Sequence, residues 1–207
     1  MFYSITGTLV TTEIAAAIID VSGVAFYCNI SAKTHAKLSS KLGEKLTLIT
    51  HLNVKEDALD LFGFISQEEL HAYRLLTSVS GVGPKAAMSI LSHLPPEQFA
   101  VAVGVGDTKA ISKAPGVGAK TAARVILELK DKIAKQISAE QENAPAETDL
   151  LPGRDNLSEA MNALLVLGYT RGEAASVLKT IDSTMSLEDM ITAALKKLMK
   201  EEDDGNG

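Results

Sequence analysis

The stretch SGVGPKAA occupies Ser80–Ala87, and a close copy of it, PGVGAKTA, occupies Pro115–Ala122. Each copy places two glycines around a valine and follows them with a lysine and small residues. Glycine allows the positive φ angles of a tight turn, which a Cβ atom would make costly. The small residues predict a helix after each turn, and the first N–H groups of a helix have no partner inside it. Both copies are therefore predicted to be hairpin turns that lead into helices.

These turns are candidate binding sites for phosphate groups. Backbone N–H groups at a helix start attract anions, and Lys85 or Lys120 adds a full positive charge beside each turn. Arg124 lies one helical turn after Lys120, where it either reaches a phosphate or serves as an ordinary surface charge. Two copies in one short segment predict two contacts with a nucleic-acid backbone.

Two nucleotide-binding motifs resemble the repeat but do not fit it. A P-loop has four residues between its glycines and a Gly-Lys-Ser/Thr triplet, whereas Pro84 and Ala119 separate glycine from lysine here. A dinucleotide-binding fingerprint needs a third glycine and a preceding strand. Neither copy has a third glycine at the required spacing, and no strand is predicted before either copy. A pair of purely structural corners with incidental lysines remains an alternative, although the repetition disfavours it.

Composition limits the classes of protein to which the chain can belong. The 207 residues are 46% apolar, and no run of 18 uncharged apolar residues predicts a membrane span. No secretory signal is predicted. The only cysteine, Cys28, excludes an internal disulfide, which fits a cytoplasmic location. Aromatic residues make up 4% of the chain, which argues against binding through aromatic stacking.

The net charge of −6 is unevenly distributed along the chain. Residues 65–135 carry 9 basic and 6 acidic side chains, whereas residues 136–207 carry 6 basic and 14 acidic ones. The segment with the repeat is therefore mildly basic. So small a charge predicts weak binding to DNA by one copy, and useful affinity needs several copies acting together.

Residues 1–64 are predicted to form a five-stranded barrel of the oligonucleotide-binding (OB) type. Short alternating runs rich in β-branched residues predict the strands, and Ala32–Ser40 predicts a helix between the third and fourth. Cys28 alternates with Phe26 and Ile30, which predicts an inert place in the barrel interior. The predicted strands are Phe2–Val10, Ile14–Val21, Val24–Ile30, Lys45–Val54 and Ala58–Phe64.

The remaining chain has helical periodicity, so the predicted fold class is α+β with several domains. Residues 65–137 contain both hairpins and end in a long amphipathic helix. Residues 138–155 combine prolines, glycine and surplus acids, which predicts a flexible tether. Residues 156–200 predict a three-helix bundle, suited to docking on another protein, whose last helix starts at Ser186. Residues 201–207 are expected to be disordered.

An active site is not expected in this chain. The four histidines have no spacing typical of metal ligands, no GxSxG sequence occurs, and Cys28 has no evident activating partner. Glu56 and Asp57 form an acidic pair at the predicted turn between the fourth and fifth strands. By itself such a pair is typical of a solvated turn, but it would repel phosphates if it lay on a DNA-binding face.

Four segments of the sequence, taken in their order and spacing, are together highly specific for one protein family. They are VKEDALDLFGF, TSVSGVGPKAAMSIL, ISKAPGVGAKTAARVILELKDK and ALLVLGYTRGEA. With them, and with its N-terminal barrel sequence, the chain resembles the RuvA family of bacterial proteins, which bind four-way (Holliday) DNA junctions. The resemblance runs from Met1 to about Lys200. Helix-hairpin-helix pairs alone also occur in polymerases, nucleases and ligases and would not suffice.

The resemblance implies a homotetramer, with an octamer left open, whose paired hairpins hold the backbone at the minor groove of each junction arm. Family members often carry a second basic residue where this chain has Ala119, which predicts a weaker phosphate contact there. The DNA-binding residues implied by the match are Gly81, Val82, Gly83, Lys85, Gly116, Val117, Gly118, Lys120 and Arg124.

The resemblance further implies roles for the acidic pair and the C-terminal bundle. Glu56 and Asp57 match the acidic pin of the family, which repels phosphates at the junction centre. The bundle would bind RuvB, the hexameric ATP-driven motor, and the RuvC resolvase would join the larger complex. The chain would act in recombination and repair as a non-catalytic subunit, with no cofactor or metal, because ATP hydrolysis belongs to RuvB.

Two other functions remain open from the sequence. One is an accessory domain of a nuclease or excision enzyme that uses the hairpins on duplex DNA, which a cluster of metal-binding carboxylates near them would favour. The other is a scaffolding protein that binds no DNA. Competition between four-way and linear DNA in a gel-shift assay separates the three functions.

Overall fold

The computed structural model describes residues 2–142, 154–182 and 184–204. The chain divides into two compact units. The first holds a barrel with helices α1 (Ala32–Leu38), α2 (Gln67–Thr77) and α3 (Pro84–His93). The second holds the helices from α4 (Pro96–Val105) onward. The hairpins are shared, because Val79–Gly81 groups with the second unit and Lys113–Val117 with the first.

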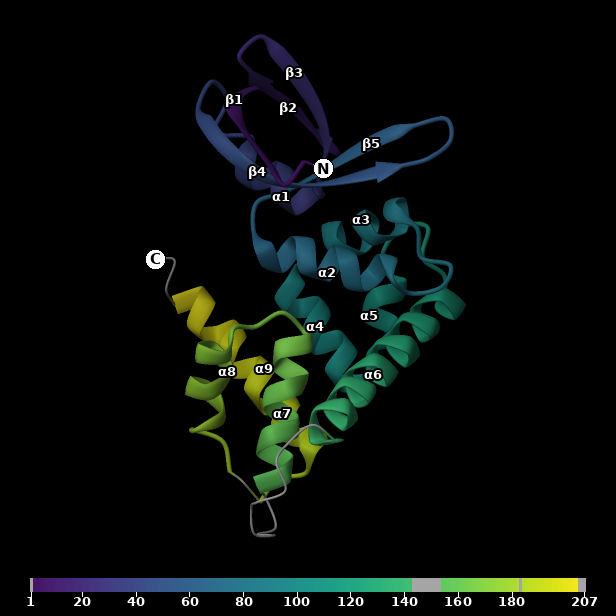
Figure 1. Ribbon diagram of the computed structural model, residues 1–207, viewed down its shortest axis with the longest axis vertical. Helices are drawn as coiled ribbons and strands as arrows, with labels where there is room; N and C mark the ends of the chain where they lie inside the picture. The colour runs from purple at the N-terminus through teal and green to yellow at the C-terminus, as the bar shows by residue number, and fades with distance from the viewer. Residues whose placement is uncertain (1, 143–153, 183, 205–207) are drawn as a thin grey trace. The chain divides into compact units, whose positions relative to one another are not determined.

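The barrel is closed, as predicted, with the strand order β1-β2-β3-β5-β4 (Figure 1). Neighbouring strands pair antiparallel, except where β3 and β5 close the barrel through one parallel pair, Asn29 with Phe62. The Asn29 side chain also donates a hydrogen bond of 3.1 Å to the Leu61 carbonyl. The strands are β1 (Ser4–Glu13), β2 (Ala16–Val21), β3 (Val24–Asn29), β4 (Lys45–Val54) and β5 (Leu59–Phe64).

The first two strands differ most from their predicted bounds. β1 continues three residues beyond Val10, to Glu13, because Thr11, Thr12 and Glu13 pair with Ile18, Ala17 and Ala16 of β2. The turn between them therefore falls at positions 14 and 15, which the sequence pattern had assigned to the second strand. A register shift between Leu9 and Thr11 lets β1 bend at this point.

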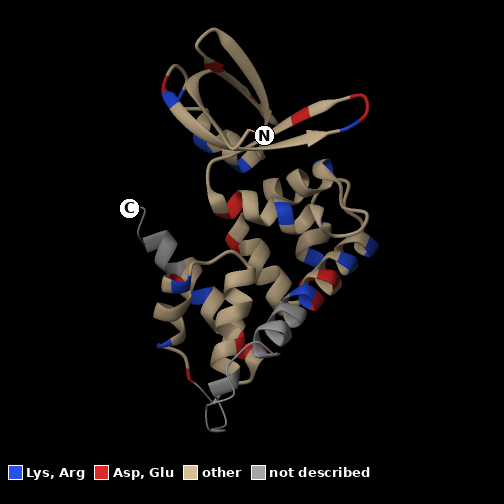
Figure 2. Ribbon diagram, in the orientation of Figure 1, with Lys and Arg blue, Asp and Glu red and all other residues tan. Residues whose placement is uncertain are grey.

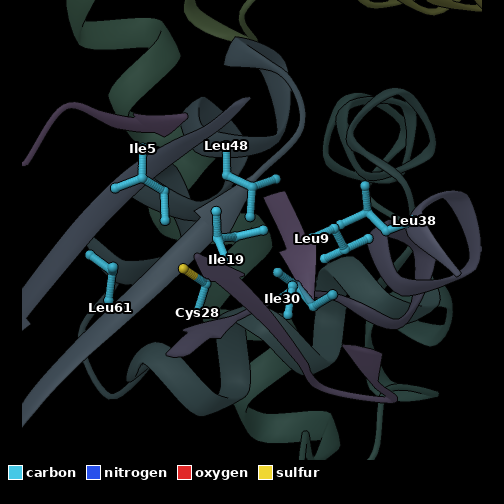
Figure 3. Close-up of a cluster of buried hydrophobic side chains, with 9 residues drawn as sticks. Ile5, Leu9, Ile19, Cys28, Ile30, Leu38, Leu48 and Leu61 are labelled. Atoms are coloured by element: carbon cyan, nitrogen blue, oxygen red, sulfur yellow. The ribbon is translucent and has the colours of Figure 1, made fainter. Parts of the chain in front are cut away.

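A cluster of aliphatic side chains fills the barrel (Figure 3). Leu9, Ile19 and Leu48 have no exposed surface, and they meet residues of the other strands and of α1. Cys28 points into the same cluster and is fully buried, which confirms its predicted place. Alternation of inward apolar and outward polar residues along the strands thus fixes the barrel.

We expect Cys28 to resist thiol reagents while the protein is folded. Burial raises the pKa of its thiol to about 12, so the reactive thiolate is scarce at neutral pH. Because the unfolded thiol ionises near 9.0, the stability contributed by this group is full below that pH and is lost between about 9 and 12. Alkylation with iodoacetamide at pH 8, with and without urea, tests this. Rapid reaction of the folded protein would contradict a buried thiol.

A buried carboxylate joins the barrel to the first long helix, within the first unit. Glu69 of α2 is 5% exposed, and its oxygens accept hydrogen bonds from Ser31 Oγ (2.6 Å), Thr34 Oγ1 (2.9 Å) and Ile65 N (3.2 Å). Ser31 caps α1, and Ile65 directly follows β5. One side chain therefore ties α1 and the end of the barrel to α2.

The helices of the hairpin region show the predicted helical faces. Leu70, Tyr73 and Leu76 of α2 are buried, and α2 packs against α3. In the second unit, α5 (Thr108–Ser112) packs against α6 (Ala119–Glu142). Val125 and Leu129 lie on the buried face of α6. This amphipathic pattern explains why each hairpin sits between two packed helices.

Three helices form the C-terminal region, and each packs on the other two. They are α7 (Arg154–Val166), α8 (Arg171–Leu178) and α9 (Leu187–Asp204). Thr170 and Glu173 form a capping box at the start of α8. The predicted cap of α9 is present, because Asp189 N donates to Ser186 Oγ at 3.2 Å and Ser186 Oγ donates to Asp189 at 2.7 Å.

Three helices extend beyond the predicted bounds, and one of them, α7, begins at Arg154, two residues before the predicted tether ends. α6 continues to Glu142, five residues into the predicted tether, because positions 138–142 hold good helix formers and the next proline is Pro145. α9 continues to Asp204, into the predicted disordered tail. Positions 143–153 and 205–207 lie outside the described residues, so the rest of the tether and tail stays a prediction. None of the helices in the described ranges is long and apolar enough to cross a membrane.

Candidate nucleic-acid interface

The first hairpin turns at Gly81 and ends at Gly83, which begins α3. Gly81 has a φ of +81°, the left-handed region that favours glycine, and it is exposed. Gly83 occupies the cap position of α3 with Pro84 after it, and no side chain caps the helix. Lys85 is exposed in the first turn of α3. The start of α3 therefore offers backbone N–H groups and a cation to an anion from solvent.

The second hairpin repeats this geometry. Gly116 has a φ of +78°, and Gly118 lies directly before α6, where its carbonyl accepts a hydrogen bond from Ala122 N (2.9 Å). Lys120 and Arg124 are exposed on consecutive turns of α6. The predicted turns and helix starts are thus present in both copies, which explains why the sequence repeats Gly-Val-Gly.

The central valines of the hairpins point inward. Val82 and Val117 are only 4% and 5% exposed, and Val117 N donates to Ala114 O at 3.0 Å. Their side chains anchor the turns by burying apolar surface. The resemblance placed both among the DNA-binding residues. Any such contact would have to come from their backbone groups, since their side chains are buried.

Residues of one hairpin meet the helix that follows the other. Ser80 and Gly81 line a hollow of about 150 Å³ together with Lys120, Thr121 and Arg124 of α6. Arg124 Nη1 donates a hydrogen bond of 3.3 Å to the Ser80 carbonyl, and Ser80 N donates one of 3.1 Å to Glu128 Oε2. The hollow has a cationic rim, so an anion is the ligand that it favours.

A second contact ties the two hairpins within the first unit. Ser89 Oγ of α3 donates a hydrogen bond of 2.6 Å to the carbonyl of Pro115, the first residue of the second copy. Neither Ser89 nor Glu128 belongs to the predicted site, because both lie away from the repeated motif in the sequence. The turns and the cations were predictable from the sequence, whereas the side chains that hold them were not.

The acidic pair lies where the sequence predicted, at the tip of the β4–β5 hairpin. Glu56 and Asp57 are both exposed, and the turn is closed by Lys55 N, which donates to Ala58 O at 2.9 Å. Lys55 forms a surface ion pair of 3.3 Å with Asp60. In Figure 2 the tip of this hairpin is coloured for acidic residues, and the first half of α6 carries basic residues with acidic ones among them. Both carboxylates are therefore accessible to solvent, and their charges can act on groups outside the barrel.

Two titratable side chains, His51 of β4 and Tyr73 of α2, pack in a cluster of aromatic rings. The Tyr73 ring contacts Phe62, Phe64 and His51, with the His51 ring centroid 5.2 Å away. Burial, together with the charge of Arg74, lowers the pKa of His51. Burial raises the pKa of Tyr73 to about 12. Within the described part of the chain, no three His, Cys, Asp or Glu residues gather so that they could hold a metal ion.

Family models match three successive segments of the chain. The RuvA N terminal domain matches residues 1–63, the SAM-like helix-hairpin-helix tandem matches 73–131, and the RuvA C-terminal domain matches 155–199. The curated relative from Symbiobacterium thermophilum is 40% identical over 97% of this chain and 100% of its own length. The chain belongs to the RuvA family. The resemblance drawn from the sequence is thereby confirmed.

Other members of the family extend the comparison. A relative from Thermoanaerobacter sp. is 46% identical over 88% of this chain and 91% of its own length. One from Ruminiclostridium cellulolyticum is 40% identical over 96% of this chain and 100% of its own length. All three relatives are named Holliday junction branch migration complex subunit RuvA. The fold is that of the family throughout: an OB-type barrel, a helix-hairpin-helix tandem and C-terminal helices.

Proposed function

We propose that this chain binds four-way (Holliday) DNA junctions without reading their sequence and brings the RuvB motor to them for branch migration in recombination and repair. The observation that carries the proposal is the pair of exposed glycine turns, each followed by an uncapped or lysine-bearing helix start. Such sites contact phosphates, which are the same in every sequence. The match over nearly the whole chain, rather than over the hairpins alone, favours this function above an accessory nuclease domain.

A homotetramer explains how weak sites give tight binding. One protomer offers only two hairpins on a mildly basic segment, whereas four protomers offer eight and can address four DNA arms. Large apolar side chains exposed on the barrel support such assembly, because burying them is favourable. Those near the N-terminus and the β4–β5 stem are Phe2, Tyr3, Val54 and Leu59, which are 49–71% exposed.

The remaining parts take roles that fit their chemistry. The C-terminal helices would dock on RuvB, with RuvC joining the complex, and the segment before α7 would let them follow the motor. ATP hydrolysis is assigned to RuvB because this sequence contains no P-loop. A buried, unpaired thiol is compatible with the cytoplasm as the place of action.

Competition between DNA forms tests the proposal. We expect an unlabelled four-way junction to displace a labelled one from the protein at far lower concentration than linear duplex of the same length. The affinity should fall steeply as salt rises, because phosphate contacts release counterions. Light scattering with and without junction measures the assembly. Equal competition by linear duplex would exclude junction recognition.

Neutralising the acidic pair is expected to preserve or tighten junction binding. Glu56→Gln with Asp57→Asn removes two negative charges per protomer from an exposed tip, so repulsion of phosphates falls and affinity rises by up to about tenfold. Branch migration by the complex with RuvB should change in rate, since the pin acts at the crossover. Glu13→Gln with Glu44→Gln, exposed acids elsewhere on the barrel, is the matched control. Weaker binding by the neutralised pair would refute the repulsion.

A further inference from the structure

Two side chains of α6 bind the backbone of Ser80, one at its N–H and the other at its carbonyl. The N–H of Ser80 donates to Glu128 Oε2 at 3.1 Å, and its carbonyl accepts from Arg124 Nη1 at 3.3 Å. Arg124 and Glu128 lie one helical turn apart, with Arg124 Nε 4.0 Å from Glu128 Oε1. Both backbone polar groups of Ser80 are therefore satisfied by side chains that lie more than forty residues later in the chain.

This arrangement sets the backbone where the first hairpin begins. Gly81, directly after Ser80, has a φ of +81°, and a Cβ atom there would lie 3.4 Å from Arg124 Nη1. The guanidinium thus packs closely over the turn. Glu128 is partly exposed, with 32% of its side chain accessible, and Arg124 is 46% accessible. Arg124 has five N–H donors, so it can hold Ser80 O and still present others to solvent.

The position of Glu128 is unexpected for a surface that binds phosphates. The Glu128 carboxylate lies 4.0 Å from Arg124, which lines the cationic hollow with Lys120, so its charge repels phosphates, and it accepts a hydrogen bond from Ser80 N. An acid that opposes binding by its charge is useful there only through the groups that it orients. Its two partners, the Ser80 amide and the Arg124 side chain, are both parts of the hairpin site.

We propose that Glu128 is a positioning residue for DNA binding: it fixes the start of the first hairpin and aims Arg124, so that the two hairpins act as one unit. The proposal rests on the proposed function and adds a residue that neither the motif nor its charge would select. The proposal predicts a change in DNA affinity of the opposite sign to that expected from charge alone. Removing this side chain and its acceptor oxygen should weaken binding to DNA, whereas removing an acid that acts only by its charge should strengthen it.

Three variants of the full-length protein separate position from charge. Glu128→Ala removes the hydrogen bond and the charge, and we expect the dissociation constant for a synthetic four-way junction to rise about tenfold. Glu128→Gln keeps an oxygen for Ser80 N–H without the charge, and it should bind within about twofold of the natural protein or more tightly. Asp131→Ala removes an equal charge from an exposed position one turn along α6, and it should not weaken binding.

Hydrogen exchange gives an independent measurement of the same contact. The Ser80 amide should exchange slowly in the natural protein and in Glu128→Gln, and faster in Glu128→Ala. Fast exchange at Ser80 in the natural protein would overturn the proposal even if Glu128→Ala failed to fold. Tight binding by a folded Glu128→Ala would also overturn it. Failure of the unsubstituted protein to prefer junctions would instead refute the proposed function itself.

Discussion

Replacing Lys85 and Lys120 together with alanine is expected to weaken binding to a four-way junction by about a hundredfold or more. Each lysine is exposed in the first turn of a hairpin helix, where it adds a full charge beside backbone N–H groups of the kind that attract anions. A single exposed ion pair is worth only about 0.2–1 kcal/mol. A tetramer, however, would lose eight such contacts at once, and their effects combine in one binding event.

The salt dependence of binding identifies the lost contacts as phosphate contacts. The slope of log K against log salt should become shallower by roughly 0.9 for each phosphate contact removed. Lys33→Ala with Lys37→Ala removes the same charge from exposed positions on α1, outside both hairpins, and it should change affinity little. Light scattering shows whether assembly is kept. Unchanged affinity and slope in the Lys85 and Lys120 variant would remove these lysines from the site.

Replacing Glu69 with leucine is expected to lower the free energy of unfolding by about 3–5 kcal/mol. The substitution leaves three donors, Ser31 Oγ, Thr34 Oγ1 and Ile65 N, without the acceptor that they share. Ser31 and Thr34 are themselves buried, and each unsatisfied buried group costs about 1–3 kcal/mol. Urea unfolding followed by circular dichroism measures the change.

The neighbouring residue supplies the control for this substitution. Glu68 is exposed on the same turn of α2, and Glu68→Leu should alter stability by less than about 0.5 kcal/mol. Glu69→Gln keeps one acceptor oxygen but introduces an NH₂ group among donors, so its loss should be intermediate. Similar stability for the leucine variants at 68 and 69 would show that the buried network contributes little.

The barrel and the hairpins were predictable because their signals are local. Alternating side chains set the strands to within a few residues, and Cys28 was placed correctly since its neighbours at two-residue spacing are apolar. The glycines at positions 81 and 116 predicted positive φ angles, which few other residues adopt, and the structure has them. The fold class and the family followed from these signals together.

Neither the side chain that joins the barrel to α2 nor the one that holds the first hairpin could be predicted, because their partners are distant in sequence. Ser66 and Glu69 have capping-box spacing, yet only half of that box is present: Glu69 N donates to Ser66 Oγ, while the carboxylate binds α1 and Ile65 instead. Glu128 looks like one acid of a mixed-charge helix, and its partner Ser80 lies 48 positions earlier. The burial of Val82 and Val117 likewise depends on packing rather than on the motif.

The closure of the barrel has a consequence for how the domain is made. β3 and β5 meet at one residue pair, reinforced by the Asn29 side chain, and β4 lies between them in sequence. This seam cannot form until β5 has left the ribosome. Until then the emerging chain can form only an open sheet, in which β3 and β4 are unpaired edge strands. Because β3 and β5 share only one residue pair, water should enter the folded barrel first at this seam.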